Sequence, residues 1–217
     1  MARRLSDKTK QKLKMGRGTG KDYKPYVTTS EFNSNGTTSV IKDWKTGRGV
    51  HCLSQGEADW YYILRWDDNN VDIREQYPLD NQVTNEIAKK NGIKHPQSES
   101  YIMTIDFMVT EADGSLHAYS VKISKNSLSK RSLEILCIEK AYCIAKGIKY
   151  TLLFKEDVNQ TLVNNIRLVT EFYDSLTVFD KYSAIKHKIA VKEYLVQMDK
   201  RAITDIILDE LLEDDKE

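Results

Sequence analysis

Two segments of alternating apolar and polar residues, 101–110 and 116–124, constrain the fold more than any other feature of the chain. Side chains of a β-strand point to opposite faces at successive positions, so each segment is predicted as a strand and the pair as a hairpin. Residues 130–146 are predicted as a helix ended by Gly147, and residues 149–154 as a further strand. A hairpin that continues into a strand–helix–strand unit predicts an α/β domain.

The flanking regions give weaker signals. Residues 55–67 have aromatic and apolar side chains at helical spacing, and residues 71–79 contain a short strand that ends near Pro78. Glycines interrupt residues 1–50, which are therefore predicted to be irregular, and after about residue 156 the chain is predicted to form helices only. The predicted divisions are a basic N-terminal arm (1–25), a core (26–156) and a C-terminal helical region with an acidic tail (157–217).

The formal net charge of +1 hides two charged ends. Residues 1–25 carry nine basic and two acidic side chains, whereas residues 201–217 carry two basic and seven acidic ones. A basic arm suits binding to a phosphate backbone, because neutralised phosphates release counterions; a solvated terminus of the same composition is the alternative. The acidic tail suits a protein partner.

Composition excludes several classes of protein. With 40% hydrophobic and 30% charged residues, the chain is predicted to be an ordinary globular protein, and 217 residues are enough for a full core. No apolar run is long enough for a transmembrane helix, and the lysine-rich start is unlike a signal peptide, so we expect no membrane association. The three cysteines form no CxxC pair, which fits a reducing cytoplasm and argues against disulfides or a zinc finger.

The predicted hairpin brings together residues with catalytic potential. A three-residue loop, 112–114, would close it with Gly114 in the left-handed conformation. This register sets Asp106 opposite Ser120 and diagonal to Lys122. A carboxylate can bind Mg²⁺, and a neighbouring lysine can stabilise developing charge or orient a water, as metal-assisted hydrolysis requires. An exposed cross-strand ion pair without a catalytic role is the alternative.

Glu57 and a glycine-rich stretch are further candidates. Ser54 and Glu57 form a capping box ahead of an apolar run, which is a structural role; alternatively, Glu57 supplies a second carboxylate to the metal site. Residues 16–22 lack the spacing and the Ser or Thr of a phosphate-binding P-loop, which excludes nucleotide binding there. We expect a flexible basic loop in which Arg17 and Lys21 contact a phosphate backbone, with a plain surface loop as the alternative.

Taken in order, these residues resemble a known family. Glu57, Asp106 and Lys122 follow the Glu…Asp…(Glu/Gln)-x-Lys signature of restriction-endonuclease-like nucleases. More closely, the chain resembles TnsA, the strand-cutting subunit of bacterial heteromeric cut-and-paste transposases. The matching stretches are Gly-Lys-Asp-Tyr (20–23) with Pro25, Lys-Thr-Gly-Arg (45–48), Leu53-Ser54 with Glu57, Val-Asp-Ile-Arg-Glu-Gln (71–76) with Pro78-Leu79, Gly-Ile-Lys-His-Pro (92–96), Thr104 with Asp106-Phe107, Val121-Lys122, and Arg131 with Leu133-Glu134.

The resemblance implies a fold and an activity. It implies a restriction-endonuclease-like mixed sheet flanked by helices, with a small C-terminal helical appendage that is a reduced form of a winged-helix-like domain. It also implies a DNA endonuclease that uses Mg²⁺, with Mn²⁺ as a substitute, to cleave the 5′-end (non-transferred) strands at transposon ends. Its expected partners are DNA, a TnsB-like transposase and a TnsC-like ATPase regulator in the bacterial cytoplasm.

The family pattern also implies roles for particular residues. Glu57 and Asp106 are expected to bind the metal, and Lys122 to complete the catalytic set. Ser120 stands where relatives carry Gln or Glu, so either the metal is bound through water and the Val121 carbonyl, or one metal is held weakly, or activity is reduced. Three basic residues shortly after the site are candidate phosphate contacts, with a solvated helix start as the alternative: Lys125, Lys130 and Arg131.

Two other readings of the resemblance stay open at this point. The chain could be a cleavage-deficient subunit that bridges the transposase and the regulator to DNA, with Ser120 marking decay of the site. It could also be a free-standing nuclease of the same fold that acts in repair or phage biology.

Overall fold

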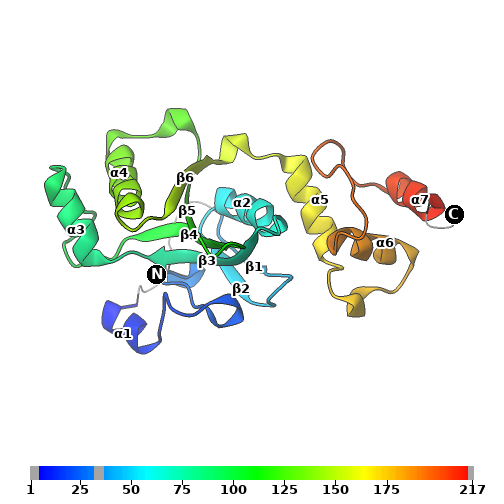
Figure 1. Cartoon of the computed structure of the whole chain (residues 1–217), viewed down its shortest axis with the longest axis horizontal. Coiled ribbons are helices and arrows are strands. Elements are labelled where there is room, and N and C mark those ends of the chain that lie inside the picture. The colour runs from blue at the N-terminus through cyan, green and yellow to red at the C-terminus, as the bar shows by residue number, and fades with distance from the viewer. Residues whose placement is uncertain (1–4, 32–36, 215–217) are drawn as a thin grey trace.

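A four-stranded mixed sheet forms the centre of the molecule in the computed structural model, which describes residues 5–31 and 37–214 (Figure 1). The helices and strands, in chain order, are α1 (Asp7–Lys12), β1 (Ser39–Lys42), β2 (Gly49–Cys52), α2 (Gln55–Trp66), β3 (Asn70–Pro78), α3 (Asn81–Lys90), β4 (Thr104–Glu111), β5 (Leu116–Lys122), α4 (Lys130–Ala145), β6 (Lys149–Phe154), α5 (Gln160–Thr170), α6 (Lys181–Ala190) and α7 (Asp205–Asp214). Two short 3₁₀ turns, η4 (Lys155–Asp157) and η5 (Ser175–Thr177), flank α5.

The strand order is β3-β4-β5-β6, in which the first two pairings are antiparallel and the third is parallel. The parallel pair follows from the connection through α4, since parallel neighbours need a crossover. In the β4–β5 hairpin, Phe107 pairs with Tyr119 and Met108 with Ala118, so continuing the register places Asp106 across from Ser120. Gly114 has φ +82, which confirms the predicted loop and its left-handed glycine.

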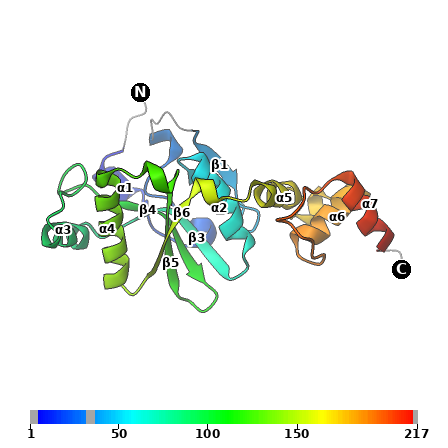
Figure 2. The ribbon, with the colours of Figure 1, turned by 90° about the horizontal axis from the view of Figure 1, so that it is seen from above.

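Helices cover both faces of this sheet (Figure 2). On one face, α2 and the β1–β2 hairpin bury Tyr61, Phe107 and Val109 in one core cluster. On the other, α3 and α4 bury Met108 and Ile138 in a second cluster. The predicted α/β arrangement of a mixed sheet flanked by helices is therefore confirmed.

The N-terminal fifty residues hold more structure than the predicted irregular segment. The β1–β2 hairpin and α1 were both expected to be irregular, and the prediction was wrong there. Lys10 of α1 is fully buried, where its ammonium contacts the Glu31 carboxylate at 2.9 Å and donates to the Tyr26 carbonyl at 2.6 Å. Glycine-rich residues 16–24 lie against β3, because the Gly20 amide donates to the Asp72 carboxylate at 3.0 Å.

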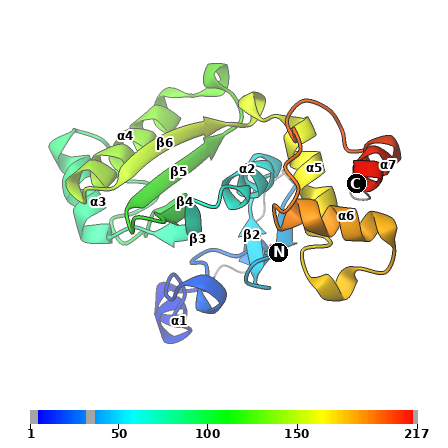
Figure 3. The same cartoon turned by 45° about the vertical axis from the view of Figure 1, so that its right-hand side comes forward.

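The C-terminal region has a small core of its own, in which α5, α6 and α7 bury Ile166, Ile185 and Leu208. Its described residues contain helices and 3₁₀ turns but no strand. Figure 3 shows these helices beside α2, at the opposite end of the molecule from α3. The Lys192 ammonium anchors them by donating to the Trp66 carbonyl at 2.7 Å, at the end of α2.

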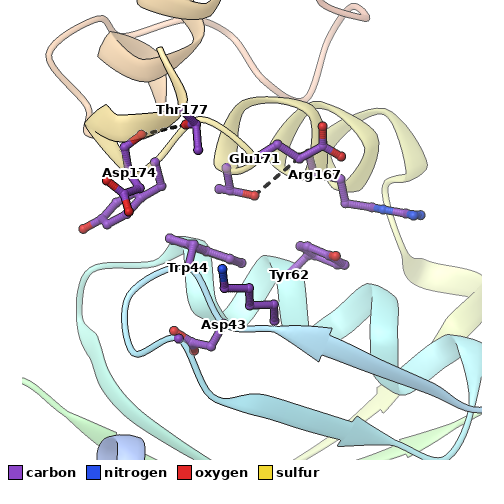
Figure 4. A pocket seen from close by; sticks show the side chains of 11 residues that line it. Asp43, Trp44, Tyr62, Arg167, Glu171, Asp174 and Thr177 are labelled. Carbon is purple, nitrogen blue, oxygen red and sulfur yellow. Dashed lines mark hydrogen bonds between the residues drawn. The ribbon is translucent and has the colours of Figure 1, made fainter. Parts of the chain in front are cut away.

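A hollow separates part of the core from the helical region. Its volume is about 580 Å³. In Figure 4, Trp44 and Tyr62 form the core side and face Glu171, Asp174 and Thr177 across the gap. The two aromatic rings are nearly parallel, at 9°, with centroids 6.0 Å apart. The seam between the two regions is thus incompletely filled at this point. Among the described residues, every helix is too short or too polar to cross a lipid bilayer.

Candidate active site

Three elements bring Glu57, Asp106 and Lys122 to one edge of the sheet. Glu57 lies in the first turn of α2, and the Ser54 hydroxyl caps this turn by accepting from the Glu57 amide at 3.1 Å. Gly56 lets the turn approach the sheet, because a Cβ there would stand 3.3 Å from Val121 Cγ1 and 3.2 Å from Lys155 Cβ. Close contact between the start of α2 and the end of β5 therefore sets the position of Glu57.

Asp106 and Lys122 meet where β4 and β5 end their pairing. The Val121 amide donates to Asp106 Oδ2 at 2.6 Å, and Lys122 Nζ lies 3.8 Å from the same oxygen. Lys122 Nζ also donates to the Val121 carbonyl at 3.0 Å. The Asp106 carboxylate raises the pKa of Lys122, so the ammonium stays charged beside it.

The Glu57 carboxylate takes part in capping α2, and it also lies near Asp106. Its Oε1 accepts from the Ser54 hydroxyl at 2.9 Å and its Oε2 accepts from the Leu53 amide at 2.9 Å, so the side chain caps α2. It is also close enough to Asp106 for the two carboxylates to repel each other. Burial, reinforced by Asp106, raises the pKa of Glu57 to about 8. A negative charge on Glu57 beside the Asp106 carboxylate is therefore unfavourable in this buried site unless a cation binds there.

Glu139 of α4 is a residue of this cluster that sequence reasoning missed. Its carboxylate accepts from the Ser120 hydroxyl at 2.6 Å and from the Tyr150 hydroxyl at 3.2 Å. Burial raises the pKa of Glu139 to about 7, with Lys122 opposing the shift and Asp106 adding to it. A third carboxyl group thus reaches the site from the crossover helix, at the position where Ser120 points. Nothing local in the sequence signals it, since the contact depends on how α4 packs on β5.

Gln76 of β3 is a second missed residue. It stands across from Asp106, because its neighbours Glu75 and Tyr77 pair with Phe107 and Ile105. Its Nε2 donates to Glu57 Oε2 at 3.2 Å. The stretch 71–76 is one of the segments that resemble the family, but no residue type in it indicates that Gln76 belongs to the site.

The donor atoms of the site suit Mg²⁺, although they do not enclose it. Glu57 and Asp106 offer carboxylate oxygens, and hard divalent cations prefer oxygen ligands. A bound cation would relieve the repulsion between these two carboxylates. The Val121 carbonyl is already bonded to Lys122, and the Ser120 hydroxyl is directed at Glu139. Within residues 5–31 and 37–214, no cluster of three or more His, Cys, Asp or Glu side chains is arranged to hold a metal.

The predicted phosphate contacts differ in exposure and in whether they lie beside acidic side chains. The Lys125 ammonium lies 3.2 Å from Asp157, and the Arg131 guanidinium lies 2.9 Å from Glu134, so both already have acidic neighbours. Lys130, at the start of α4, is exposed. Arg17 and Lys21 are exposed on the glycine-rich segment, in which Arg17 bridges to Lys24 through the backbone.

An open hollow of about 700 Å³ lies near the start of α2, but its lining contains none of the three candidate catalytic residues. Gln55 and Asp59, on either side of Glu57 in α2, form one wall, and Ile123 and Ser124, which follow Lys122, form another. Ile123 is 72% exposed. The hollow at the seam in Figure 4 also has none of the three candidate catalytic residues in its lining.

Comparisons with known proteins find similarity to one family. Residues 67–154, from β3 to the end of β6, match the family described as TnsA-like endonuclease N terminal. The chain is 35% identical over 155 residues to the transposon Tn7 transposition protein TnsA of Escherichia coli. That alignment covers 70% of this chain and 57% of the relative, so the chain spans little more than half of the relative's length. Together, the fold, the matched segment and this identity show that the chain belongs to the TnsA family.

Proposed function

We propose that this chain is a Mg²⁺-dependent DNA endonuclease that cleaves the 5′-end strands at transposon ends. The observation that carries the proposal is the convergence of Glu57, Asp106 and Lys122 from α2, β4 and β5 on one edge of the sheet. The name of the relative, a transposition protein, supports the biological setting. Mn²⁺ is expected to substitute for Mg²⁺, since both prefer oxygen ligands.

In this proposal Glu57 and Asp106 hold the metal ion. When bound, Mg²⁺ would polarise the scissile phosphate and help to generate the attacking hydroxide. The Lys122 ammonium, kept charged by Asp106, stabilises negative charge that develops on the phosphate or orients the water. Ser120 donates to Glu139, so any contribution of Ser120 to the metal site would be through water. The Val121 carbonyl would become a ligand if Lys122 turned toward the phosphate.

The surfaces around the site suit a DNA strand. Lys130 is available for a phosphate, and the arm carries Arg17 and Lys21 on its exposed side. Lys125 and Arg131 would first have to leave their acidic neighbours. We therefore expect Lys130 and the arm to contribute more to DNA affinity than Lys125 and Arg131.

The division into a basic arm (1–25), a nuclease core (26–156) and a C-terminal region (157–217) stays part of the proposal. A TnsB-like transposase would cut and join the other strand, and a TnsC-like ATPase would regulate both, in the bacterial cytoplasm. The acidic tail, of which residues 215–217 lie outside the described residues, is the expected contact with such a partner.

The test is strand cleavage of transposon-end DNA by the assembled transposase with Mg²⁺. Asp106→Asn keeps the shape of the side chain but removes its charge, and it should abolish 5′-strand cleavage while joining of the other strand continues. Asp113→Asn, in the exposed loop of the same hairpin, is the matched control and should leave cleavage unchanged. Undiminished cleavage by the Asp106 variant would refute the proposal.

One observation favours a second candidate, a cleavage-deficient subunit that bridges the transposase and the regulator to DNA. Ser120 and Glu57 are both committed to hydrogen bonds within the protein, which leaves Asp106 as the least encumbered ligand. Titration calorimetry with Mn²⁺ separates the two candidates. Binding that disappears in Asp106→Asn supports the nuclease, whereas no binding by the wild-type chain supports the bridging subunit.

A further inference from the structure

Gln76 has a backbone conformation that a β-strand residue rarely adopts. Its φ is +47, in the left-handed region that strains any residue with a Cβ. Among the described residues, three other non-glycine residues have positive φ, and none of them lies in a strand: Lys14, Gln97 and Lys192. Gln76 is also 3% exposed. Strain of this kind persists only where the surroundings fix it, and it concentrates at functional sites.

The contacts of Gln76 connect the two candidate metal ligands. Its Nε2 donates to Glu57 Oε2 at 3.2 Å, and its Oε1 accepts from the Thr104 hydroxyl at 3.1 Å. Thr104 begins β4, two residues before Asp106. In the charged state that binds a cation, the Glu57 carboxylate can only accept hydrogen bonds, so the amide nitrogen then has to face Glu57 and the amide oxygen Thr104. The orientation of the amide is thereby fixed from both sides.

The Gln76 amide completes the set of groups that hold Glu57. The Ser54 hydroxyl and the Leu53 amide bind the carboxylate from the helix side, at the start of α2. Gln76 binds it from the sheet side and is fixed, through Thr104, to the strand that carries Asp106. Without this bond, the carboxylate would depend on the end of a helix alone, and its last torsion is soft. The distance between the two carboxylates would then vary.

We propose that Gln76 is a positioning residue, which keeps the Glu57 carboxylate in the orientation in which Glu57 and Asp106 bind one divalent cation. The inference rests on the proposed function and adds a residue to it. Gln76 reaches no reacting atom and acts only through Glu57. Groups that hydrogen-bond a ligating carboxylate typically change metal affinity by about 10- to 100-fold when removed.

The experiment measures Mn²⁺ and Mg²⁺ binding to the full chain by titration calorimetry, which does not require cleavage. Gln76→Leu removes the amide at similar volume, and Gln76→Gly removes it while relieving the strained backbone. Both should weaken binding about tenfold or more. Gln97→Leu is the matched control, because Gln97 is also left-handed, at φ +54, but is exposed, and it should stay within about twofold of wild type.

Thr104→Val tests the same contact from its other end. It leaves Gln76 in place but frees the amide to rotate, so it should weaken Mn²⁺ binding by less than Gln76→Leu does. The variant with both substitutions should bind Mn²⁺ no more weakly than Gln76→Leu alone, because the two substitutions disrupt the same chain of contacts. Circular dichroism and thermal unfolding identify the variants that fold. If Gln76→Leu does not fold, the metal affinities of Gln76→Gly and Thr104→Val test the role of Gln76.

The outcomes separate this inference from the proposed function. Wild-type affinity for Mn²⁺ in folded Gln76→Gly and Thr104→Val overturns the role of Gln76 while leaving the metal site intact. Absence of Asp106-dependent binding in the wild-type chain overturns the metal site itself, and the role of Gln76 with it. Weaker binding in the Gln76 and Thr104 variants, with Gln97→Leu unchanged, supports both.

Discussion

Glu139 should make the protein less stable as the pH rises from about 4.5 toward neutrality. Its pKa is about 7 in the folded chain against a reference value of 4.5, because burial disfavours the carboxylate. The folded state therefore keeps a proton that the unfolded state has lost, and stability falls as pH rises from about 4.5 to about 7. Between pH 5 and pH 8 the loss from this one group is about 2 to 3 kcal/mol.

Glu139→Gln removes the titrating group with little change of shape. The Ser120 and Tyr150 hydroxyls both donate to the same oxygen, Oε2, so one amide oxygen can replace it. The free energy of unfolding would be measured in urea at pH 5 and pH 8, without divalent metal, for the variant and the wild type. The free energy of unfolding of the variant, relative to that of the wild type, should rise by about 2 to 3 kcal/mol between these two pH values.

Glu134→Gln is the matched control for this experiment. Glu134 lies on the same helix, and its side chain is 31% exposed and paired with Arg131 at the surface. This substitution should change stability by less than about 0.5 kcal/mol. A difference between Glu139→Gln and wild type that stays constant from pH 5 to pH 8 would refute the reasoning, because it would mean that Glu139 holds no extra proton in the folded state.

Three further substitutions test other parts of the structure. Lys10→Met should destabilise the fold by about 3 kcal/mol in urea unfolding, because it leaves the Glu31 carboxylate without its buried partner, and adding Glu31→Gln should recover part of the loss. Gly114→Ala should lower the free energy of unfolding by about 1 kcal/mol, because Gly114 has a positive φ. Gly18→Ala should lower it further, because Gly18 has a positive φ and its new Cβ would also lie 2.5 Å from the Asp22 carbonyl oxygen. Lys192→Met removes the hydrogen bond to the Trp66 carbonyl, so the segment that joins β6 to α5 should be cleaved faster in limited proteolysis. Equal cleavage rates in the variant and the wild type would contradict the anchoring role of Lys192.

The elements that could be predicted from the sequence are those with local signals. The hairpin register followed from alternation and from Gly114, and the helix over 130–146 corresponds to α4 (Lys130–Ala145). The β1–β2 hairpin could not be predicted, because its four-residue strands are stabilised by packing of Ile41 and Val50 under α2. Helix α3 was missed although Asp80 caps it, since its few apolar residues form only a narrow stripe.

The candidate site divides in the same way. Glu57, Asp106 and Lys122 could be named because they follow a known order of residues along the chain. Glu139 and Gln76 could not be named, because their role comes from contacts between elements far apart in sequence. Ser120 shows the difference most clearly. The sequence marks it only as a departure from the family pattern, whereas the structure adds that a glutamate from another helix reaches it.

The parallel pairing of β5 with β6 has a consequence for synthesis on the ribosome. Lys122 lies on β5, which is paired on one side with β4 and on the other with β6. Strand β6 ends at Phe154, and it can join the sheet only after α4 has formed the crossover. The chain therefore cannot complete the strand that carries its lysine until β6 has left the ribosome, well after Glu57 and Asp106 have emerged. A nascent or prematurely terminated chain that lacks β6 would thus leave one side of β5 unpaired, even though it already contained Glu57, Asp106 and Lys122.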